Sequence, residues 1–317
     1  MTNANLPTAA PLPESAHCPA ALTLLPESAN TSCPLCSGQE QAILSRYDGK
    51  SLRRCLNCGV AFVHPQPSPI DLAAHFENAR QTGPDEMECK FETNREQVLA
   101  RVADYIQLHR PPGHIVDVGC ATGIFLDRFL ADNPAWRGAG VELSPGLTGR
   151  AARRGLSIHL GNLRSANLTP GSVDVITVLD AFYYFANPQA DLAEFRRVLT
   201  PAGLLVLELP WAGTRIWRTS ARVGRLLGGA RRPLLESSDH LFYYTPHSIS
   251  LLLGACGFRV QTMVPLPGNR QAGRLRDLAY RAYSAFSRRL YFISGSRLFL
   301  GPRFLVLAES TCASEKS

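Results

Sequence analysis

The stretch His114-Ile-Val-Asp-Val-Gly-Cys-Ala-Thr-Gly123 decides the fold of this chain. Its apolar first half predicts a strand, and the apolar Ile124-Phe125-Leu126 that follows predicts a helix. Gly119 between them permits a tight turn and a close approach of the backbone to a ligand. A helix that starts near Thr122 would point its free N–H groups at that ligand and favour a carboxylate or phosphate. The stretch therefore predicts a site for a nucleotide-type cofactor.

The glycine pattern separates two classes of cofactor. A dinucleotide fingerprint requires G-x-G-x-x-G, but Ala121 stands at its second glycine and the third has no counterpart in register. The run from Asp117 to Gly123 instead resembles the first motif of class I S-adenosylmethionine-dependent methyltransferases, usually D-x-G-x-G-x-G. The resemblance implies that this loop binds the methyl donor S-adenosylmethionine. Ala121 departs from the motif and should narrow the pocket by about one methyl group.

Three later passages support the same resemblance. Glu142 ends the second predicted strand, where a carboxylate can accept hydrogen bonds from both ribose hydroxyls. Asn162 stands where the family usually has an aspartate that contacts the adenine amino group, and its amide oxygen can still accept. Residues 197–203 resemble the R-x-L-x-P-G-G passage of the family. The predicted cofactor-binding residues are Asp117, Gly119, Cys120, Ala121, Gly123, Glu142, Leu143, Asn162, Leu163 and Asp180.

Strands and helices alternate through the rest of the chain, which indicates an α/β fold with a mostly parallel sheet covered on both faces. The resemblance covers roughly residues 92–309 and implies the Rossmann-like seven-stranded sheet of methyltransferases. The predicted strands are 114–118, 137–141, 156–160, 173–179, 203–209, 258–264 and 303–308.

Two C-x-x-C pairs precede this domain, Cys33–Cys36 and Cys55–Cys58, with eighteen residues between them. Two turns that each present two thiolates are what a tetrahedral Zn²⁺ site requires, and the spacing is typical of zinc ribbons. With no spare ligand position the zinc should be structural and supply much of the folding energy of so short a segment. Residues 54–67 also resemble a bacterial methyltransferase subgroup with an N-terminal zinc ribbon, whose members methylate varied small molecules, sugars and natural products.

These patterns divide the chain into four parts. We expect a disordered tail at 1–30, a zinc ribbon at 31–65, a linker at 66–91 and the S-adenosylmethionine-binding domain at 92–317. Two basic helices at 214–228 and 271–290 do not fit the alternation and are predicted as insertions. No apolar run is long enough to span a bilayer, and the N-terminus lacks a secretory pattern, so we expect a cytoplasmic protein.

Methyl transfer needs a nucleophile near attack distance and often a base to remove its proton. His240 is the leading base candidate, since a histidine pKa lies near neutrality, and Asp239 could orient it. The alternative is that His240 only bonds the backbone before the next helix. Tyr183 is the third catalytic candidate, and with Tyr184 and Trp211 it could form an aromatic wall for the substrate or simply belong to the core.

The formal net charge is +7, and residues from 201 onward carry 16 basic and 6 acidic side chains. Rows of arginine on the two predicted insertions suit a lid over an anionic or carrier-linked small-molecule acceptor, a membrane surface, or packing against the domain. An RNA-modifying methyltransferase is the alternative function. We expect nucleic acid not to be the partner, because the zinc ribbon is not notably basic and no Asn/Asp-Pro-Pro-Tyr signature follows the fourth strand. A non-catalytic binding module is disfavoured by the intact cofactor motifs.

Overall fold

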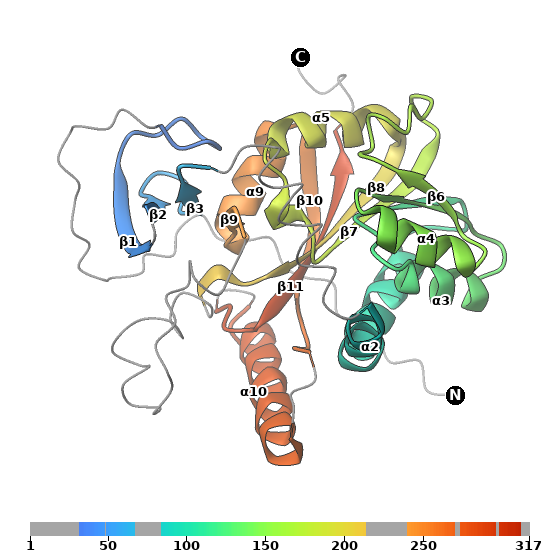
Figure 1. The fold of residues 1–317 in the computed structure, drawn as a ribbon. Coiled ribbons are helices and arrows are strands. Elements are labelled where there is room, and N and C mark those ends of the chain that lie inside the picture. Colours follow the sequence, from blue (N-terminus) through green and yellow to red (C-terminus); the bar gives the residue numbers. More distant parts are fainter. Residues whose placement is uncertain are drawn as a thin grey trace.

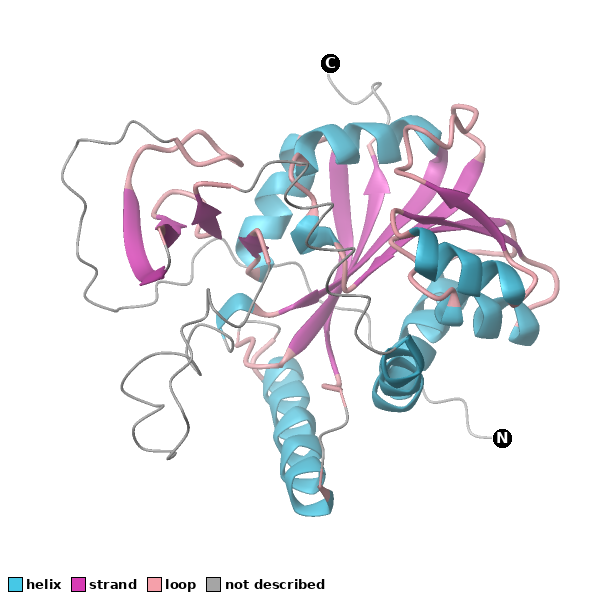
Figure 2. Cartoon of the chain, viewed as in Figure 1, coloured by secondary structure: helices cyan, strands magenta, loops and turns pink. Residues whose placement is uncertain are grey.

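The structure is a computed structural model, and it describes residues 32–47, 49–66, 84–213, 240–269, 273–295 and 298–311. Its strands form a seven-stranded sheet and a separate four-stranded sheet (Figures 1 and 2). The predicted tail at 1–30, most of the predicted linker, the predicted basic helix at 214–228 and Asp239 lie outside the described residues.

The large sheet has the order β10-β11-β8-β7-β4-β5-β6. Neighbouring strands from β6 to β8 are parallel, whereas β11 runs antiparallel to both β8 and β10. All seven predicted strands are present, so the prediction of a Rossmann-like seven-stranded sheet is confirmed. The strands are β4 (His114–Val118), β5 (Arg137–Glu142), β6 (Ser157–Leu160), β7 (Val173–Leu179), β8 (Leu199–Pro210), β10 (Phe258–Leu266) and β11 (Arg303–Ser310).

The large sheet is buried on both faces, as parallel sheets usually are. Side chains alternate between two cores along each strand, so that Leu205 and Leu207 join one core while Leu204 and Val206 join the other. Helices α2 (Pro84–His109) and α3 (Ile124–Asp132) cover one face. Helices α5 (Pro188–Val198) and α9 (Pro246–Ala255) cover the opposite face.

Helix α2 is longer than the sequence pattern indicated. It begins at Pro84, whereas a start near 92 was predicted, so the last part of the predicted 66–91 linker is helical. The apolar positions that gave the helical period begin only at Val98, and proline is well tolerated in a first helical turn. Arg95, which lies on this helix before the first apolar position Val98, is buried.

The small sheet consists of β1 (Gln41–Tyr47), β2 (Lys50–Cys55), β3 (Ala61–His64) and β9 (Phe242–Tyr243), all antiparallel. The first three strands belong to the cysteine-containing segment, but β9 comes from the chain between β8 and α9. Phe62 and Phe242 are both fully buried in one core with the β7 and β8 side chains. The cysteine-containing segment is therefore joined to the larger domain through a shared strand and a shared core (Figure 1).

Helix α10 (Arg274–Ile293) lies between β10 and β11, and it begins and ends three residues later than the basic helical insertion predicted at 271–290. In Figure 1 it extends away from the sheet edge where β10 ends and β11 begins. Among the described residues, no helix is long and apolar enough to cross a membrane.

Candidate functional site

The loop after β4 is built from left-handed backbone conformations. Gly119 and Gly123 both have φ 75°, and Ala121 has φ 51°. A Cβ atom at Gly119 would lie 2.9 Å from the Cβ of Ala181, so this position needs glycine for space as well as for its dihedral angle. The N–H groups of Gly119 and Cys120 donate to Val141 O at 2.8 and 3.2 Å, which fixes the loop against β5.

Helix α3 begins at Ile124, slightly later than the predicted start near Thr122, and Gly123 is its N-cap. Gly123 offers no side chain to cap the helix, so the first N–H groups are left for a ligand. The hydroxyl of Thr122 is buried and has no hydrogen-bond partner in the described part of the chain. Buried polar groups are normally paired, so this orphan hydroxyl fits a ligand held by the loop.

Glu142 ends β5 and connects the loop to the next helix. Its Oε2 accepts from Ala121 N and its Oε1 accepts from Ser144 N, both at 2.9 Å, and the side chain is buried. Ser144 caps α4 (Pro145–Arg153). Each carboxylate oxygen has lone pairs beyond these bonds, so the group can also accept from ribose hydroxyls. Leu143 beside it is 61% exposed, an apolar side chain suited to lie against an adenine ring.

The remaining predicted cofactor residues differ in their surroundings. Asn162 is exposed, and its Oδ1 accepts from Ser165 N at 2.9 Å in a turn, whereas Leu163 is buried. Cys120 is buried with its sulfur facing Gly140. Asp117 accepts from Thr177 Oγ1 at 2.6 Å on the neighbouring strand β7, and burial raises its pKa to about 7. Contacts of these residues with a cofactor stay predictions.

Asp180 belongs to a buried ion network that the sequence analysis missed. Arg303 lies 2.8 Å from Asp180 and is also hydrogen-bonded to Glu208, and Arg95 bonds Glu208 and lies 3.5 Å from Asp180. Glu208 is fully buried, and Arg95 is 3% exposed. Burial alone would raise the pKa of Asp180, but Arg303 and Arg95 outweigh it and hold that pKa well below its usual range.

The network leads to two of the predicted catalytic residues through the short helix η1 (Phe182–Tyr184). The Tyr183 hydroxyl donates to Asp180 Oδ1 at 2.9 Å. The rings of Tyr183 and His240 are stacked with centroids 3.6 Å apart, and Leu241 N donates to Tyr183 O at 3.1 Å. His240 is buried, with Tyr184 edge-on at 5.3 Å. Tyr183 and His240 thus lie together, while their partner in the prediction, Asp239, is outside the described residues.

The four paired cysteines form a second candidate site. Their sulfur atoms all lie within 4.8 Å of one another, and the Cys33–Cys58 and Cys36–Cys55 sulfurs are 3.7 and 3.5 Å apart. A tetrahedral zinc with Zn–S bonds of about 2.3 Å separates its sulfurs by about 3.8 Å, so this cluster fits that ion.

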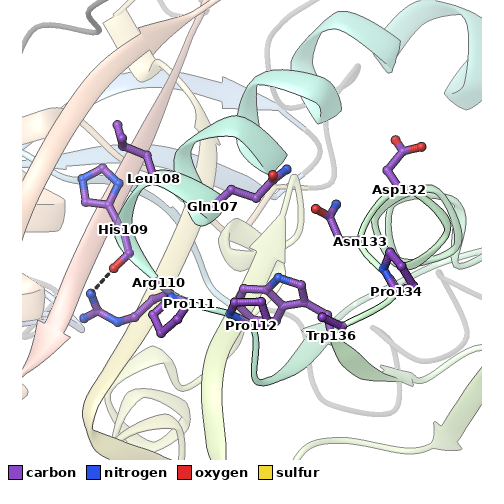
Figure 3. Close-up of a pocket in the computed structure, with 11 residues that line it drawn as sticks. Gln107, Leu108, His109, Arg110, Pro111, Pro112, Asp132, Asn133, Pro134 and Trp136 are labelled. Atoms are coloured by element: carbon purple, nitrogen blue, oxygen red, sulfur yellow. Dashed lines mark hydrogen bonds between the residues drawn. The ribbon is translucent and has the colours of Figure 1, made fainter.

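A pocket of about 500 Å³ lies elsewhere on the molecule (Figure 3). It is lined by Gln107 near the end of α2, by Arg110 just after that helix, and by Asn133 and Trp136 from the segment before β5. These segments lie at the amino ends of β4 and β5. Ligands of open α/β sheets bind at the opposite edge, beyond the carboxyl ends of the strands, so this pocket is separate from the candidate site.

Comparison with known proteins agrees with this geometry. A family model described as a methyltransferase domain matches residues 91–263. A malonyl-[acyl-carrier protein] O-methyltransferase of Alcanivorax borkumensis is 32% identical over 33% of this chain and 37% of its own length. A dTDP-4-amino-2,3,4,6-tetradeoxy-D-glucose N,N-dimethyltransferase of Saccharopolyspora spinosa is 36% identical over 31% of this chain and 40% of its own length. The chain therefore matches only about two fifths of the length of these relatives.

Among solved structures, a chain from the complex between the Haloferax volcanii Trm112 methyltransferase activator and its methyltransferase has a TM-score of 0.51 and 20% identity. The match covers 76% of this chain and 98% of that chain, and it shows a common fold. The family model spans more than half of the chain, and the sheet order and glycine loop have the corresponding structure. The chain belongs to the class I S-adenosylmethionine-dependent methyltransferase family.

Proposed function

We propose that this protein transfers the methyl group of S-adenosylmethionine to an oxygen or carbon atom of a small-molecule acceptor. The observation that carries the proposal is the position of η1. Ala181, just before η1, lies against Gly119 of the cofactor loop, and Tyr183 within it stacks on His240. One short segment therefore joins the donor loop to a buried histidine at the same edge of the sheet.

The donor would be held by the residues around the loop. The uncapped N-terminus of α3 suits its carboxylate, Glu142 suits the ribose hydroxyls, and Leu143 offers an apolar surface to the adenine. When bound, S-adenosylmethionine supplies an activated methyl group on a sulfonium. The acceptor gives up a proton as its new bond to carbon forms, so the protein needs a group that takes that proton.

His240 is the residue we assign to this proton. Asp180 is already neutralised by Arg303 and Arg95. Burial, together with the nearby Asp180 carboxylate, raises the pKa of Tyr183 well above its ordinary value, so its phenol remains protonated and acts as a donor. A histidine ring can accept a proton near neutral pH, and Tyr183 holds that ring in place by stacking.

The two relatives named above act on a malonyl group of an acyl-carrier protein and on a nucleotide-linked amino sugar. We propose an acceptor of similar kind, anionic or linked to a carrier. RNA modification is not favoured, because the cysteine-containing segment packs into the core through β9 and Phe62.

The proposal is tested with His240→Gln, and with His247→Gln at an exposed position of α9 as the matched control. Methyl transfer from tritiated S-adenosylmethionine to a cell extract should fall by about 100-fold for His240→Gln, the low end of the usual contribution of a general base. Binding of S-adenosylhomocysteine by calorimetry should be unchanged in both variants. Unchanged transfer by His240→Gln would remove the histidine from this role.

We also propose that the cysteine cluster holds one structural zinc ion. Elemental analysis should find about one zinc per chain in the wild-type protein and in Cys256→Ser, and less than about half in Cys55→Ser. Because β3 of this segment pairs with β9, loss of zinc should also make the chain around His240 more sensitive to proteolysis. Wild-type protein purified without zinc would contradict the assignment.

A further inference from the structure

Helix α10 presents its polar face to the protein. Ser284, Ser287 and Tyr291 are its most buried side chains. Tyr291 donates from its hydroxyl to Met263 O on β10, and Ser284 accepts from Gly268 N at 3.3 Å. The helix is therefore held to the large domain largely by hydroxyl groups that bond the backbone of its neighbours.

The opposite face of α10 carries large apolar side chains that face solvent, with the exposed Arg289 among them near the end of the helix. Leu275, Leu278, Phe286 and Ile293 are 83%, 65%, 63% and 82% exposed. Together with Ala282 they follow one another at spacings of three, four, four and seven residues, which places them on one stripe. A surface helix of a globular protein normally turns such a stripe toward the core. The reversed orientation of α10 indicates an apolar environment other than the described residues of the chain.

The charge of α10 indicates what that environment is. The helix carries five arginines and one aspartate, and Arg274, Arg281 and Arg288 recur every seven residues along one side of the apolar stripe. A second copy of the chain would bring these arginine rows close together with little acidic charge to balance them. An anionic lipid surface offers both the apolar layer for the stripe and phosphates for the arginines.

We propose that α10 lies in the surface of an anionic membrane, with Leu275, Leu278 and Phe286 in the apolar layer and Arg274 and Arg281 at the headgroups. The helix starts from the edge of the sheet where Leu266 pairs with Arg303 and Arg303 pairs with Pro210. Asp180 and Tyr183 lie at the same edge. Binding in this way would bring the candidate site close to the lipid, and the inference itself stands independently of the methyl-transfer reaction.

The test is co-sedimentation of the full chain with vesicles. The wild-type protein should bind vesicles of phosphatidylcholine mixed with phosphatidylglycerol at least about tenfold more tightly than vesicles of phosphatidylcholine alone. The double variant Leu278→Gln with Phe286→Gln should lose about tenfold or more of that affinity. Leu108→Gln with Leu160→Gln removes two leucines exposed at other places and serves as the control, which should bind as the wild type does.

A charge-reversal variant, Arg274→Glu with Arg281→Glu, should abolish the preference for anionic vesicles and keep the same far-ultraviolet circular dichroism. The proposal is overturned if the wild-type protein binds neither kind of vesicle or binds both with equal affinity. It is also overturned if the Leu278 and Phe286 variant binds the anionic vesicles as tightly as the wild type does. Light scattering gives a further test. If the wild-type protein is a dimer and the Leu278 and Phe286 variant is a monomer, the apolar stripe binds a second copy of the chain, and the membrane proposal is overturned.

Discussion

The donor and acceptor sides of the candidate site are built from different parts of the chain, backbone on the donor side and side chains on the acceptor side. The donor side consists of backbone: a loop with positive φ at Gly119, Ala121 and Gly123, held by one carboxylate that accepts two backbone N–H groups. The acceptor side rests on charged side chains from α2, β8, β11 and the residue that follows β7. A backbone site is specified locally, whereas a side-chain network exists only after distant segments have packed.

The largest effect is expected from a substitution in the side-chain network of the acceptor side. Arg303→Met would leave Asp180 and Glu208 with only Arg95 to balance two buried carboxylates. Removing one partner of a buried ion pair costs about 3–5 kcal/mol, so urea unfolding should show a loss of that order in the free energy of unfolding.

Arg259→Met is the matched control, since Arg259 is 65% exposed and pairs with Glu309 at 3.6 Å. An exposed pair contributes about 0–1 kcal/mol, so this variant should unfold almost as the wild type does. Equal effects of the two substitutions would show that the network near Asp180 does not hold the acceptor side together.

The same contrast explains what the sequence could predict. The seven strands, the glycine loop and Glu142 follow from hydrophobic runs and from residues a few positions apart. Arg95 and Glu208 are 113 residues apart and were missed. One signal was available: Glu208 is a lone carboxylate inside the apolar run 204–209, and a buried carboxylate needs a cation. Which of 33 basic residues supplies it depends on packing that no local pattern encodes.

Helix α10 shows a related limit. The helix and its rows of arginine were predicted from the sequence. The face that turns toward the domain was not predicted, because Tyr291 and Ser284 could equally well have faced water. Hydrogen bonds to Met263 and Gly268, formed only in the packed structure, decide the orientation.

On the donor side, Glu142 is the residue whose charge can be removed with the least change of shape. Glu142→Gln keeps the shape of the side chain but replaces one acceptor oxygen by a donor next to the Ala121 or Ser144 N–H group. Charged hydrogen bonds contribute about 1.5–3 kcal/mol, so S-adenosylhomocysteine binding by calorimetry should weaken by about tenfold or more. Glu96→Gln, at an exposed position of α2, should leave the affinity unchanged. Equal affinity of both variants would remove Glu142 from the donor site.

Asp117 gives the donor side a dependence on pH. Burial raises its pKa in the folded chain from 3.8 to about 7, so the folded state holds a proton that the unfolded state has lost between these values. The free energy of unfolding should therefore fall with rising pH in this window, by up to about 1.4 kcal/mol per pH unit from this group.

Asp117→Asn cannot titrate and can still accept from Thr177. Urea unfolding at several pH values should therefore give a constant difference in the free energy of unfolding between the two proteins above pH 7 and below pH 3.8. Between pH 3.8 and pH 7 that difference should change with pH. A constant difference across the window would show that Asp117 ionises normally in the folded chain.

The smallest expected effect acts on the backbone alone. Ala121 has φ 51°, a conformation that costs an L-residue roughly 1–2 kcal/mol and glycine almost nothing. Ala121→Gly should therefore stabilise the protein by about 1 kcal/mol, although glycine generally destabilises. Ala193→Gly, at an exposed position inside α5, should destabilise by about the same amount. Opposite signs from one substitution at two positions would confirm that the donor side depends on backbone conformation, because no side-chain contact beyond one methyl group is changed in either variant.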